Sequence, residues 1–546
     1  MTDYHPDSTL FGGYRPFTNH LLLLIDEANV PSTLVPSAFS WFAPGASDSF
    51  EQSTTAAVEL GYRLVKRRAF LRTLGTVGVC TAIAGCTTRS NEEPTPTPTP
   101  NPGDEAVSPD PSPQLSVLNA VEDLGMDPTG QEAIDDILDD AYEDDTVVEF
   151  PPGDYLVTRE HDWDRGVSNF QLVGLGKSHK DVQFVFPTNG SGEQFRMLRI
   201  TSGDSHVLKN FSIQQTDDDT TSADIWLAND DGALIEDVEW LGRTPSDSHA
   251  RDQLLLFDCT SVDGVNVARR VYMREGAELP GYPNGVAGIR ITERSVGEVK
   301  MIDCHIEQRG SSSFRATHTR GVLRVEGGLF KNNDNTNMRI SAGDHPSKTS
   351  WIKGATVVVD ADNLNEHAHD GDKLDSPEGL RIDSTGHGYT GVLIEDCDFI
   401  FRSSPFSPGI ITAPTYGSHG GFTLRNCRII NDTSVQTIHA GPVDTAIADE
   451  PWGMVLDNVT ITGSCTRQPY GSAVVIGNNR NRSRIIDSCI HLPDGRVGGV
   501  LVDTADDCSI ENTSINVSGP PTRTRGTTTL SLQNVSHTET CAFRDR

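Results

Sequence analysis

The chain has 546 residues and a net charge of −33, from 77 acidic and 44 basic side chains, of which only nine are lysines. So acidic a surface repels phosphate backbones, which excludes DNA and RNA as partners. Acid-rich, lysine-poor sequence is typical of proteins from extreme halophiles, whose carboxylate surfaces stay hydrated in concentrated salt. A solvated surface is therefore the ordinary explanation of any one carboxylate, and calcium binding by an acidic patch is the alternative.

Residues 1–64 show neither a repeat nor a clear hydrophobic period. We expect this doubtful N-terminal extension to be a gene-start error, with translation beginning near Val65. A signal peptide should stand close to the N-terminus, and the signal in this chain begins only at Lys66. The alternative is a real extension in which residues 21–25 form a short apolar segment.

Residues 65–86 are the predicted export signal. The twin arginine Arg67-Arg68 is followed by a short apolar stretch that ends in Ile83-Ala84-Gly85-Cys86. This stretch is too short to span a membrane. It resembles a twin-arginine signal that ends in a lipobox, which implies that Cys86 receives a lipid and becomes the mature N-terminus. A lipid there would tether the protein to the extracellular face of the cell membrane.

Residues 87–116 are rich in proline and threonine, with the run PTPTPTPNP at 94–102. Sequence of this kind stays extended, so it predicts a linker between the lipid anchor and a folded domain at 117–546.

Residues 119–158 predict a helix followed by a strand. Thr129 is placed to cap the helix, whose apolar residues recur at the spacing of one helical face. These apolar residues are Ala133, Ile134, Ile137, Leu138 and Ala141. The strand is expected at Thr146–Phe150. An N-terminal α-helical cap is expected here, because the open end of a repeat stack exposes core and unpaired strand edges.

One pattern recurs along the rest of the chain: an apolar residue, any residue, Asn or Asp, any two residues, and a second apolar residue. We call the Asn or Asp the marker; it occurs at Asn210, Asp237, Asp303, Asp396, Asn426, Asn458, Asp487 and Asn512. Three further copies carry Arg269, Gly327 and Gly354 at the marker position. The period of about 30 residues indicates a stacked repeat. Asn, Asp and Gly tolerate the left-handed backbone of a sharp corner, so each copy predicts strand, corner, strand.

The apolar residues beside each marker should point into the coil and stack on their equivalents. Helical solenoids need apolar spacing of 3.6, which these short runs lack. We therefore predict an all-β chain that forms a single-stranded right-handed parallel β-helix. In this fold Ile394, Leu424 and Leu456 stack in successive coils, with Asp396, Asn426 and Asn458 at one corner.

Three cysteines, Cys304, Cys397 and Cys427, each directly follow a marker, and Cys489 follows one by two positions. Apolar residues take the first of these positions in other repeats, so it should face the core. We favour free buried thiols, which behave as small hydrophobes. Disulfides are the alternative, because eight cysteines follow Cys86 in a chain predicted to be exported. Since no CxxC pair is present, a zinc site is not expected.

The stretch Asp127-Pro128-Thr129-Gly130, the stretch Phe150-Pro151-Pro152-Gly153-Asp154-Tyr155 and the coils together resemble the pectate-lyase-like superfamily over about residues 117–540. The chain as a whole resembles haloarchaeal surface lipoproteins with parallel β-helix repeats. The resemblance implies the pectin-lyase-like fold and cleavage of acidic polysaccharide. It does not choose an activity, because the superfamily holds lyases, hydrolases, epimerases, tailspikes and adhesins.

The catalytic motifs of the superfamily are mostly missing. The Arg-x-Pro-x-x-Arg stretch of pectate lyases is absent, and of the polygalacturonase set only Gly386-His387-Gly388 is present. A loop histidine between two glycines is the ordinary explanation of that motif.

Two polar segments, Lys331–Arg339 and Glu366–His387, are the candidate site. As a lyase site, Lys331, Arg339 or Lys373 acts as the base or neutralises a substrate carboxylate, and His369 shuttles protons. The predicted substrate-binding residues are Asn333, Asn335, Asn337, Arg381 and His387. If a metal is used, Ca²⁺ is the expected cofactor, bound to Asp334, Asp370 and Asp372. Loop residues that leave adjacent coils lie close together in space, so we expect both segments to line one shared groove. The alternative is an asparagine ladder beside a solvated loop.

Three functions stay open. The favoured one is a lyase-like activity on an acidic polysaccharide, and the alternatives are a non-catalytic glycan-binding or adhesion protein and a glycoside hydrolase. The expected partners are an acidic polysaccharide or surface glycan and, through the lipid on Cys86, the membrane. We expect a monomer.

We predict that Cys86→Ser releases the protein into the medium or leaves it as unprocessed precursor, because no lipid can then be attached. Cell fractionation and mass spectrometry of the N-terminal peptide measure this. A variant that stays on membranes with the wild-type mature N-terminus would show that Cys86 is not lipidated.

Overall fold

The computed structural model describes residues 115–187, 195–215, 223–244, 253–281, 285–384, 387–414, 419–537 and 541. The chain divides into two compact units, Met1–Asp104 and Glu105–Arg546, and every described residue belongs to the second. The predicted extension, the export signal with Cys86 and most of the linker therefore lie outside the described residues. Among the described residues, no helix has the length and apolar character needed to cross a membrane.

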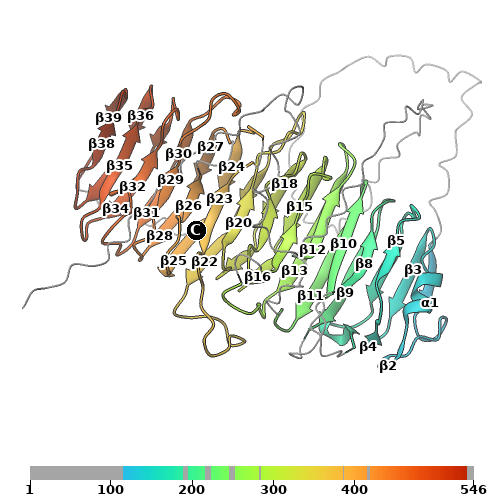
Figure 1. Ribbon diagram of the computed structural model, residues 1–546. Helices are drawn as coiled ribbons and strands as arrows, with labels where there is room; N and C mark the ends of the chain where they lie inside the picture. The colour runs from blue at the N-terminus through green and yellow to red at the C-terminus, as the bar shows by residue number, and fades with distance from the viewer. Residues whose placement is uncertain are drawn as a thin grey trace, which may run out of the picture. The chain divides into compact units, whose positions relative to one another are not determined.

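The second unit is a parallel β-helix made of two long sheets, in which every strand pairing is parallel (Figure 1). Sheet A has 26 strands and takes two segments from most coils, one before the corner and one after it. The strands before the corner are β1 (Ser116–Asn119), β3 (Thr146–Phe150), β6 (Gln171–Gly174), β15 (Glu298–Ile302), β18 (Val322–Glu326), β21 (Trp351–Lys353), β24 (Val392–Glu395), β27 (Phe422–Arg425), β30 (Met454–Asp457), β33 (Arg484–Ile486), β36 (Cys508–Glu511) and β39 (Leu530–Gln533).

The strands after the corner are β2 (Thr129–Ala133), β4 (Gly153–Leu156), β7 (Val182–Val185), β16 (His305–Glu307), β19 (Leu329–Lys331), β22 (Thr356–Asp360), β25 (Asp398–Ser403), β28 (Arg428–Asn431), β31 (Thr460–Thr462), β34 (Cys489–Leu492) and β37 (Ser514–Val517). Three strands run through the corner: β9 (Val207–Gln214), β11 (Leu234–Leu241) and β13 (Val265–Met273).

In the described residues sheet B has 13 strands, one from each coil between the coil of β3 and the coil of β36. They are β5 (His161–Trp163), β8 (Phe195–Ile200), β10 (Ala223–Asn229), β12 (Gln253–Cys259), β14 (Ala287–Arg290), β17 (Phe314–Ala316), β20 (Thr336–Ile340), β23 (Glu378–Ile382), β26 (Ile411–Ala413), β29 (Ile438–Ala440), β32 (Ser472–Ile476), β35 (Gly498–Asp503) and β38 (Thr522–Arg525).

The apolar residue before each marker is buried and stacks on its equivalent. Ile394 pairs with Leu424, and Leu424 pairs with Leu456, as predicted. The same row reaches from Leu208 through Ile235 to Ile510 and ends at Leu532. Sheet B adds an inward row of its own, including Ile289, Phe314, Met338 and Leu380. One continuous core thus runs between the two sheets. Its predicted right-handedness stays a prediction.

The markers adopt the left-handed backbone that a corner needs. All eight Asn and Asp markers, together with Gly327 and Gly354, have φ between 49° and 68°. The predicted marker Arg269 is wrong by one position. Arg270 takes the corner with φ 50°, and Ala268 and Met273 point inward in place of Val267 and Tyr272.

The predicted front helix is much shorter than expected. Thr129 begins β2 instead of capping a helix, because the Asp127 carboxylate accepts hydrogen bonds from the backbone N–H of Thr129, Gln131 and Glu132. The helix α1 (Asp135–Asp140) has six residues and follows Ile134, which is buried with Leu138. That a helical cap closes this end of the coil stays a prediction.

The cysteines divide between the two predicted states. Cys304, Cys397 and Cys427 are free and buried, as expected for thiols that face the core. Cys489 forms a disulfide with Cys541, which joins β34 to the C-terminal segment.

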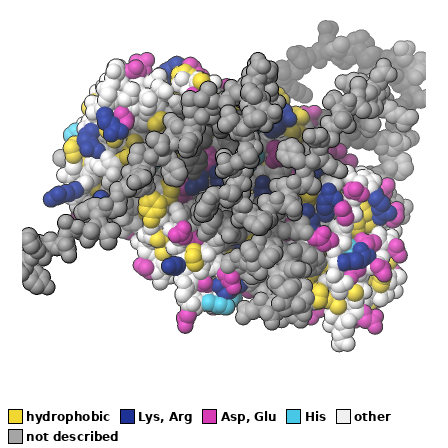
Figure 2. Space-filling view, in the orientation of Figure 1, with side chains coloured by type: hydrophobic (Ala, Val, Ile, Leu, Met, Phe, Trp, Pro, Cys, Tyr) yellow, Lys and Arg dark blue, Asp and Glu magenta, His cyan; other side chains and the backbone are white. Residues whose placement is uncertain are grey.

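One outward-facing row of sheet A alternates in sign from coil to coil. Lys353 pairs with Glu395 at 3.0 Å, Glu395 with Arg425 at 3.4 Å, and Arg425 with Asp457 at 3.1 Å. These residues occupy the same register position on four neighbouring strands. On the face shown in Figure 2, basic and acidic side chains lie intermixed wherever described side chains are visible. Sheet A therefore neutralises its own surface.

We predict that Leu424→Ala lowers the free energy of unfolding by about 2–5 kcal/mol, because it leaves a cavity in the stacked row. Denaturant titration measures this. The matched control is Thr423→Ala on the same strand, whose side chain points outward and whose loss should cost much less. Equal losses for the two variants would contradict the inward assignment.

Candidate functional site

Four arginines lie side by side on the outer face of sheet B. Register pairs Arg290 with Arg315, Arg315 with Arg339, and Arg339 with Arg381. The neighbouring residues Ile289, Phe314, Met338 and Leu380 are buried inward, so alternation along each strand turns the arginines outward. We call these four residues the arginine row. Neighbouring strands lie ~4.8 Å apart, so the row sets four like charges at one strand spacing. Like charges directly opposite each other destabilise a sheet.

A second row runs beside the arginine row, two residues further along each strand. It contains Asp258, Thr292, Thr317, Ser341 and Asp383, and we call it the oxygen row. All five are buried. Thr317 Oγ1, Ser341 Oγ and Asp383 Oδ1 make no hydrogen bond within the part of the chain that the structure describes. Buried polar atoms nearly always have partners, so three such atoms in adjacent coils indicate a place for water or ligand.

Two members of the arginine row are held by carboxylates. Arg339 donates to Asp383 Oδ2 at 2.8 and 3.1 Å. Arg381 donates to Glu378, whose Oε2 also accepts from Thr412 Oγ1 at 2.8 Å. These contacts fix the guanidinium planes, which prepares them to bind a planar anion such as a carboxylate.

Asp258 is the acid with the most altered environment in the oxygen row. Burial raises the pKa of its carboxyl group to about 6, although hydrogen bonds from Thr292 N (2.8 Å) and Thr292 Oγ1 (2.9 Å) act in the opposite direction. A carboxyl group that titrates near neutral pH can hold or release a proton during a reaction.

His318 follows β17 by two residues and is half-buried. Burial lowers the pKa of its imidazole, and Arg315, Arg290 and Arg339 lower it further, against an opposing effect of Glu293. The imidazole is therefore unprotonated at neutral pH, in the state in which it can accept a proton.

Aromatic groups stand at both ends of the arginine row. Trp226 lies in the same register two strands before Arg290 and has the guanidinium of Arg196 5.0 Å from its ring centroid. Beyond Thr412 the row reaches His439, whose ring lies 4.4 Å from that of Tyr470. Burial and the charge of Arg480 lower the pKa of His439 to about 4.

Lys331, a predicted catalytic residue, lies on sheet A and not beside Arg339. Its Nζ is 3.4 Å from Glu307 Oε2. It lines a polar cavity of about 420 Å³ together with Arg274, His305, Glu307 and the segment 365–367. Lys331 and Arg339 therefore belong to different sheets, and the predicted shared groove is divided.

The asparagines between Lys331 and Arg339 are structural. Asn333 Nδ2 donates to Asn337 Oδ1 at 2.9 Å, and Asn337 Nδ2 donates to the backbone oxygen of Glu378 at 2.9 Å. Both side chains are fully buried and Asn335 is nearly so. These asparagines form a buried network, which differs from the alternative prediction of an asparagine ladder beside a solvated loop.

The long loop after β22 packs back over earlier coils. Asp372 accepts from Arg243 at 2.8 Å, and His369 Nδ1 lies 2.6 Å from the same guanidinium. Asp370 and Lys373 are exposed, and Lys373 lines a cavity of about 590 Å³ on the far side of the loop. Within the described ranges, no contact joins this loop to Arg339.

The predicted calcium ligands are not assembled. Asp334 is buried and accepts hydrogen bonds from the backbone N–H of Gly281 and Asp375, whereas Asp372 binds Arg243. Among the described side chains, no group of three or more His, Cys, Asp or Glu could hold a metal ion.

Of the predicted residues, Arg339 and Arg381 lie side by side on the outer side of sheet B, where Arg381 is buried, and His387 follows Asp383 by four positions. His387 is exposed and its ring stacks on Tyr389 with centroids 5.0 Å apart. Sequence reasoning missed Arg290, Arg315, Asp258 and His318. A repeat alignment anchored on sheet B would have shown the arginines, but the markers anchor sheet A.

Neither a family model nor a curated protein matches the chain. Solved structures with similarity include an α-1,3-glucanase catalytic unit from Streptomyces thermodiastaticus, with 14% identity and a TM-score of 0.38 over 78% of this chain and 69% of that one. The A-module of the mannuronan C-5 epimerase AlgE4 from Azotobacter vinelandii has 10% identity and a TM-score of 0.34 over 78% and 100%. The surface adhesin PfbA of Streptococcus pneumoniae has 12% identity and a TM-score of 0.40 over 77% and 93%. Such low scores carry no argument about activity.

We predict that stability falls as the pH rises from about 4 through about 6, because the pKa of Asp258 in the folded protein lies above the unfolded value of 3.8. The folded state binds the proton of Asp258 more tightly than the unfolded state does. The stability that this proton contributes is therefore full below the pKa of the unfolded state and lost above the pKa of the folded state. Asp258→Asn removes the charge and should stabilise the protein at pH 7 by on the order of 3 kcal/mol, without a gain near pH 4.

Denaturant titration across this pH range measures the effect. Thr423→Ala, which removes no titrating group, is the control and should leave the shape of the profile unchanged. An Asp258→Asn profile parallel to that of the wild type would contradict the raised pKa.

Proposed function

We propose that this protein is an exported, lipid-anchored surface β-helix that binds an acidic polysaccharide along the arginine row and cleaves it by a lyase-like reaction. The observation that carries the proposal is the set of four arginines in consecutive register on a chain of net charge −33.

A regular polyanion fits this row better than a small ligand. The positive charges recur at one strand spacing over four coils, so a chain with regularly repeated carboxylates can neutralise several of them at once. The overall negative charge disfavours nucleic acid, whose affinity depends on neutralising many phosphates. Aromatic rings at Trp226 and Tyr470 provide apolar surface beyond the charged segment.

The arrangement supports β-elimination. A guanidinium of the arginine row neutralises the uronate carboxylate, which makes the neighbouring C5 proton easier to remove. His318 accepts that proton, the C5–H electrons form the C4–C5 double bond, and the C4–O bond breaks. The leaving oxygen takes a proton from water. In this proposal Arg339 binds the carboxylate, whereas Lys331 and Lys373 belong to other surfaces and have no part.

Non-catalytic binding, as in an adhesin, is the second candidate. The contacts of Arg339 with Asp383 and of Arg381 with Glu378 hold the guanidiniums rigidly, which suits a recognition surface equally well. Product formation separates the two functions, because binding alone yields no unsaturated uronate.

We predict that Arg315→Gln weakens binding of a polyuronate such as polygalacturonate or alginate by about tenfold, because one charge-assisted contact is lost. Arg290→Gln/Arg315→Gln should weaken it further and reduce its dependence on salt. Titration calorimetry of the folded domain measures affinity, and ultraviolet absorbance of the unsaturated product measures turnover.

The matched control is Arg425→Gln, which removes an arginine from the alternating row of sheet A and should leave binding unchanged. Equal effects of Arg315→Gln and Arg425→Gln would show that the arginine row is not the site. Binding without product would leave the recognition role and remove the lyase.

A further inference from the structure

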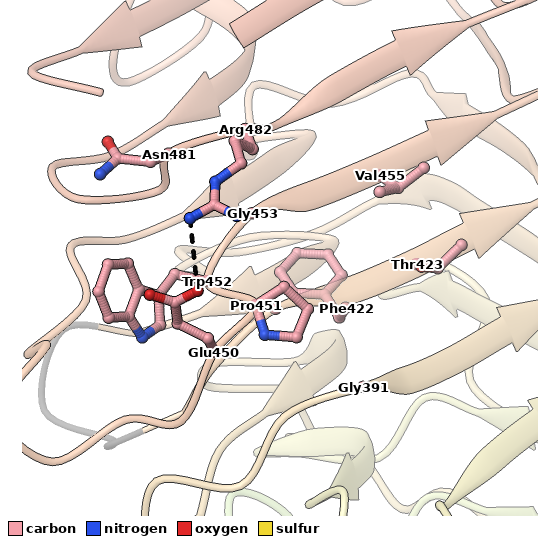
Figure 3. A pocket seen from close by; sticks show the side chains of 11 residues that line it. Gly391, Phe422, Thr423, Glu450, Pro451, Trp452, Gly453, Val455, Asn481 and Arg482 are labelled. Carbon is pink, nitrogen blue, oxygen red and sulfur yellow. Dashed lines mark hydrogen bonds and ion pairs between the residues drawn. The ribbon is translucent and has the colours of Figure 1, made fainter. Parts of the chain in front are cut away.

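A small cleft of about 110 Å³ lies at the turns that lead into β24, β27, β30 and β33, on elements that the arginine row does not use. Figure 3 shows its lining. The lining residues are Gly391, Gly421, Phe422, Thr423, Glu450, Pro451, Trp452, Gly453, Val455, Asn481 and Arg482.

Glycines form the floor of the cleft. Gly391, Gly421 and Gly453 each stand directly before the first strand of a coil, so three neighbouring coils carry no side chain there. The backbones pack closely: Gly391 N donates to Gly421 O at 2.8 Å, and a Cβ on Gly421 would lie 2.4 Å from Gly453 O. At Gly421 and Gly453 the backbone of the next coil fills the space that a side chain would take, so glycine is needed for this close packing beside the cleft.

Rings form the apolar wall. The indole N–H of Trp452 donates to Ala448 O at 2.9 Å, which fixes the orientation of a half-buried ring. In Figure 3, Pro451 and Phe422 lie beside this residue. Apolar walls with a few placed polar groups are the usual composition of a small-molecule site.

Polar groups of both signs form the rim. Arg482 donates to Glu450 at 3.3 Å, and the two side chains are 67% and 55% exposed, so both can also reach a ligand. Figure 3 shows this pair facing each other across the cleft, with Asn481 nearby. The charges of the lining cancel, in contrast to the arginine row.

We infer that this cleft is a binding site for one uncharged sugar ring, a neutral hexose at the end or side of a glycan. The C–H face of the ring packs on Trp452 and Pro451, while its hydroxyl groups exchange hydrogen bonds with Glu450, Asn481 and Arg482. An enclosed cavity of about 150 Å³ holds one benzene ring, so an open cleft of 110 Å³ accommodates one face of a single ring. A uronate would upset the charge balance of the rim, because its carboxylate would compete with Glu450 for Arg482.

Ligand-observed NMR of the folded domain tests this with methyl glucoside, galactoside and mannoside, and with methyl glucuronide as the charged counterpart. At least one neutral glycoside should bind saturably and more tightly than the glucuronide. Trp452→Ala should weaken that binding by about tenfold or more, because the packing surface is lost. Glu450→Gln, on an exposed side chain whose change leaves the fold intact, should weaken it severalfold.

The matched control is Arg484→Gln, which removes the arginine of a comparable exposed ion pair with Glu511 and should not change binding. Arg315→Gln should not change it either, so the cleft and the arginine row can fail separately. The inference is overturned if no neutral glycoside binds, if the glucuronide binds best, or if both Trp452→Ala and Glu450→Gln bind like the wild type.

Discussion

In-register parallel stacking is the constraint on which the rest of this structure depends. Each side chain stands beside its equivalent in the next coil at one strand spacing of ~4.8 Å, so every row shares one environment. An inward row must be apolar throughout, as Ile394, Leu424 and Leu456 are. An outward charged row must alternate in sign or repel itself, and Lys353, Glu395 and Arg425 alternate.

The arginine row departs from this rule over four coils. In sheet A the like-charged register pair Lys300 and Arg324 shares the carboxylate of Glu298. Natural sequences break local rules chiefly at functional sites, where a partner supplies the missing interaction. Asp383 and Glu378 reduce the repulsion at Arg339 and Arg381, but both approach from the side and neither stands in register between two arginines. The unpartnered oxygens of Thr317 and Ser341 lie next to the same residues. A row of like charges and a row of buried oxygens without hydrogen bonds in the described residues thus lie on one face.

The corners could be predicted from sequence because left-handed backbone is a local requirement that Asn, Asp and Gly meet. The error at Arg269 arose where none of these residues is present. Arg270 holds the strained corner with the help of Asp237, whose Oδ1 accepts from its Nε at 2.6 Å. That contact joins two coils, so the sequence pattern of a single repeat does not reveal it. The prediction of a long front helix was wrong for a similar reason. The backbone N–H groups of Thr129 and Gln131 donate to the Asp127 carboxylate, and not to the bonds of a helix.

The site was harder to predict because turns, unlike corners, vary in length. Arg315 and Arg339 each follow the marker of their own coil, Asp303 and Gly327, by twelve residues. Arg381 follows Gly354 by twenty-seven residues, so a register anchored on sheet A aligns two of the arginines and not the whole row. We expected Lys331 and Arg339 to lie close together because they are near in sequence. The buried turn between them places Lys331 on sheet A and Arg339 on sheet B.

Coil architecture also explains how one chain can carry separate binding surfaces. The core requires only that the inward-facing rows are apolar, so residues in the outward-facing rows and in the turns can change without disturbing it. The arginine row belongs to strands β14 to β23, whereas the glycine-floored cleft belongs to turns before β24, β27, β30 and β33. The arginine row carries only positive charges, whereas the positive and negative charges of the cleft balance. Chemistry that differs this much between parts of one solenoid suits a glycan that contains both acidic and neutral sugars.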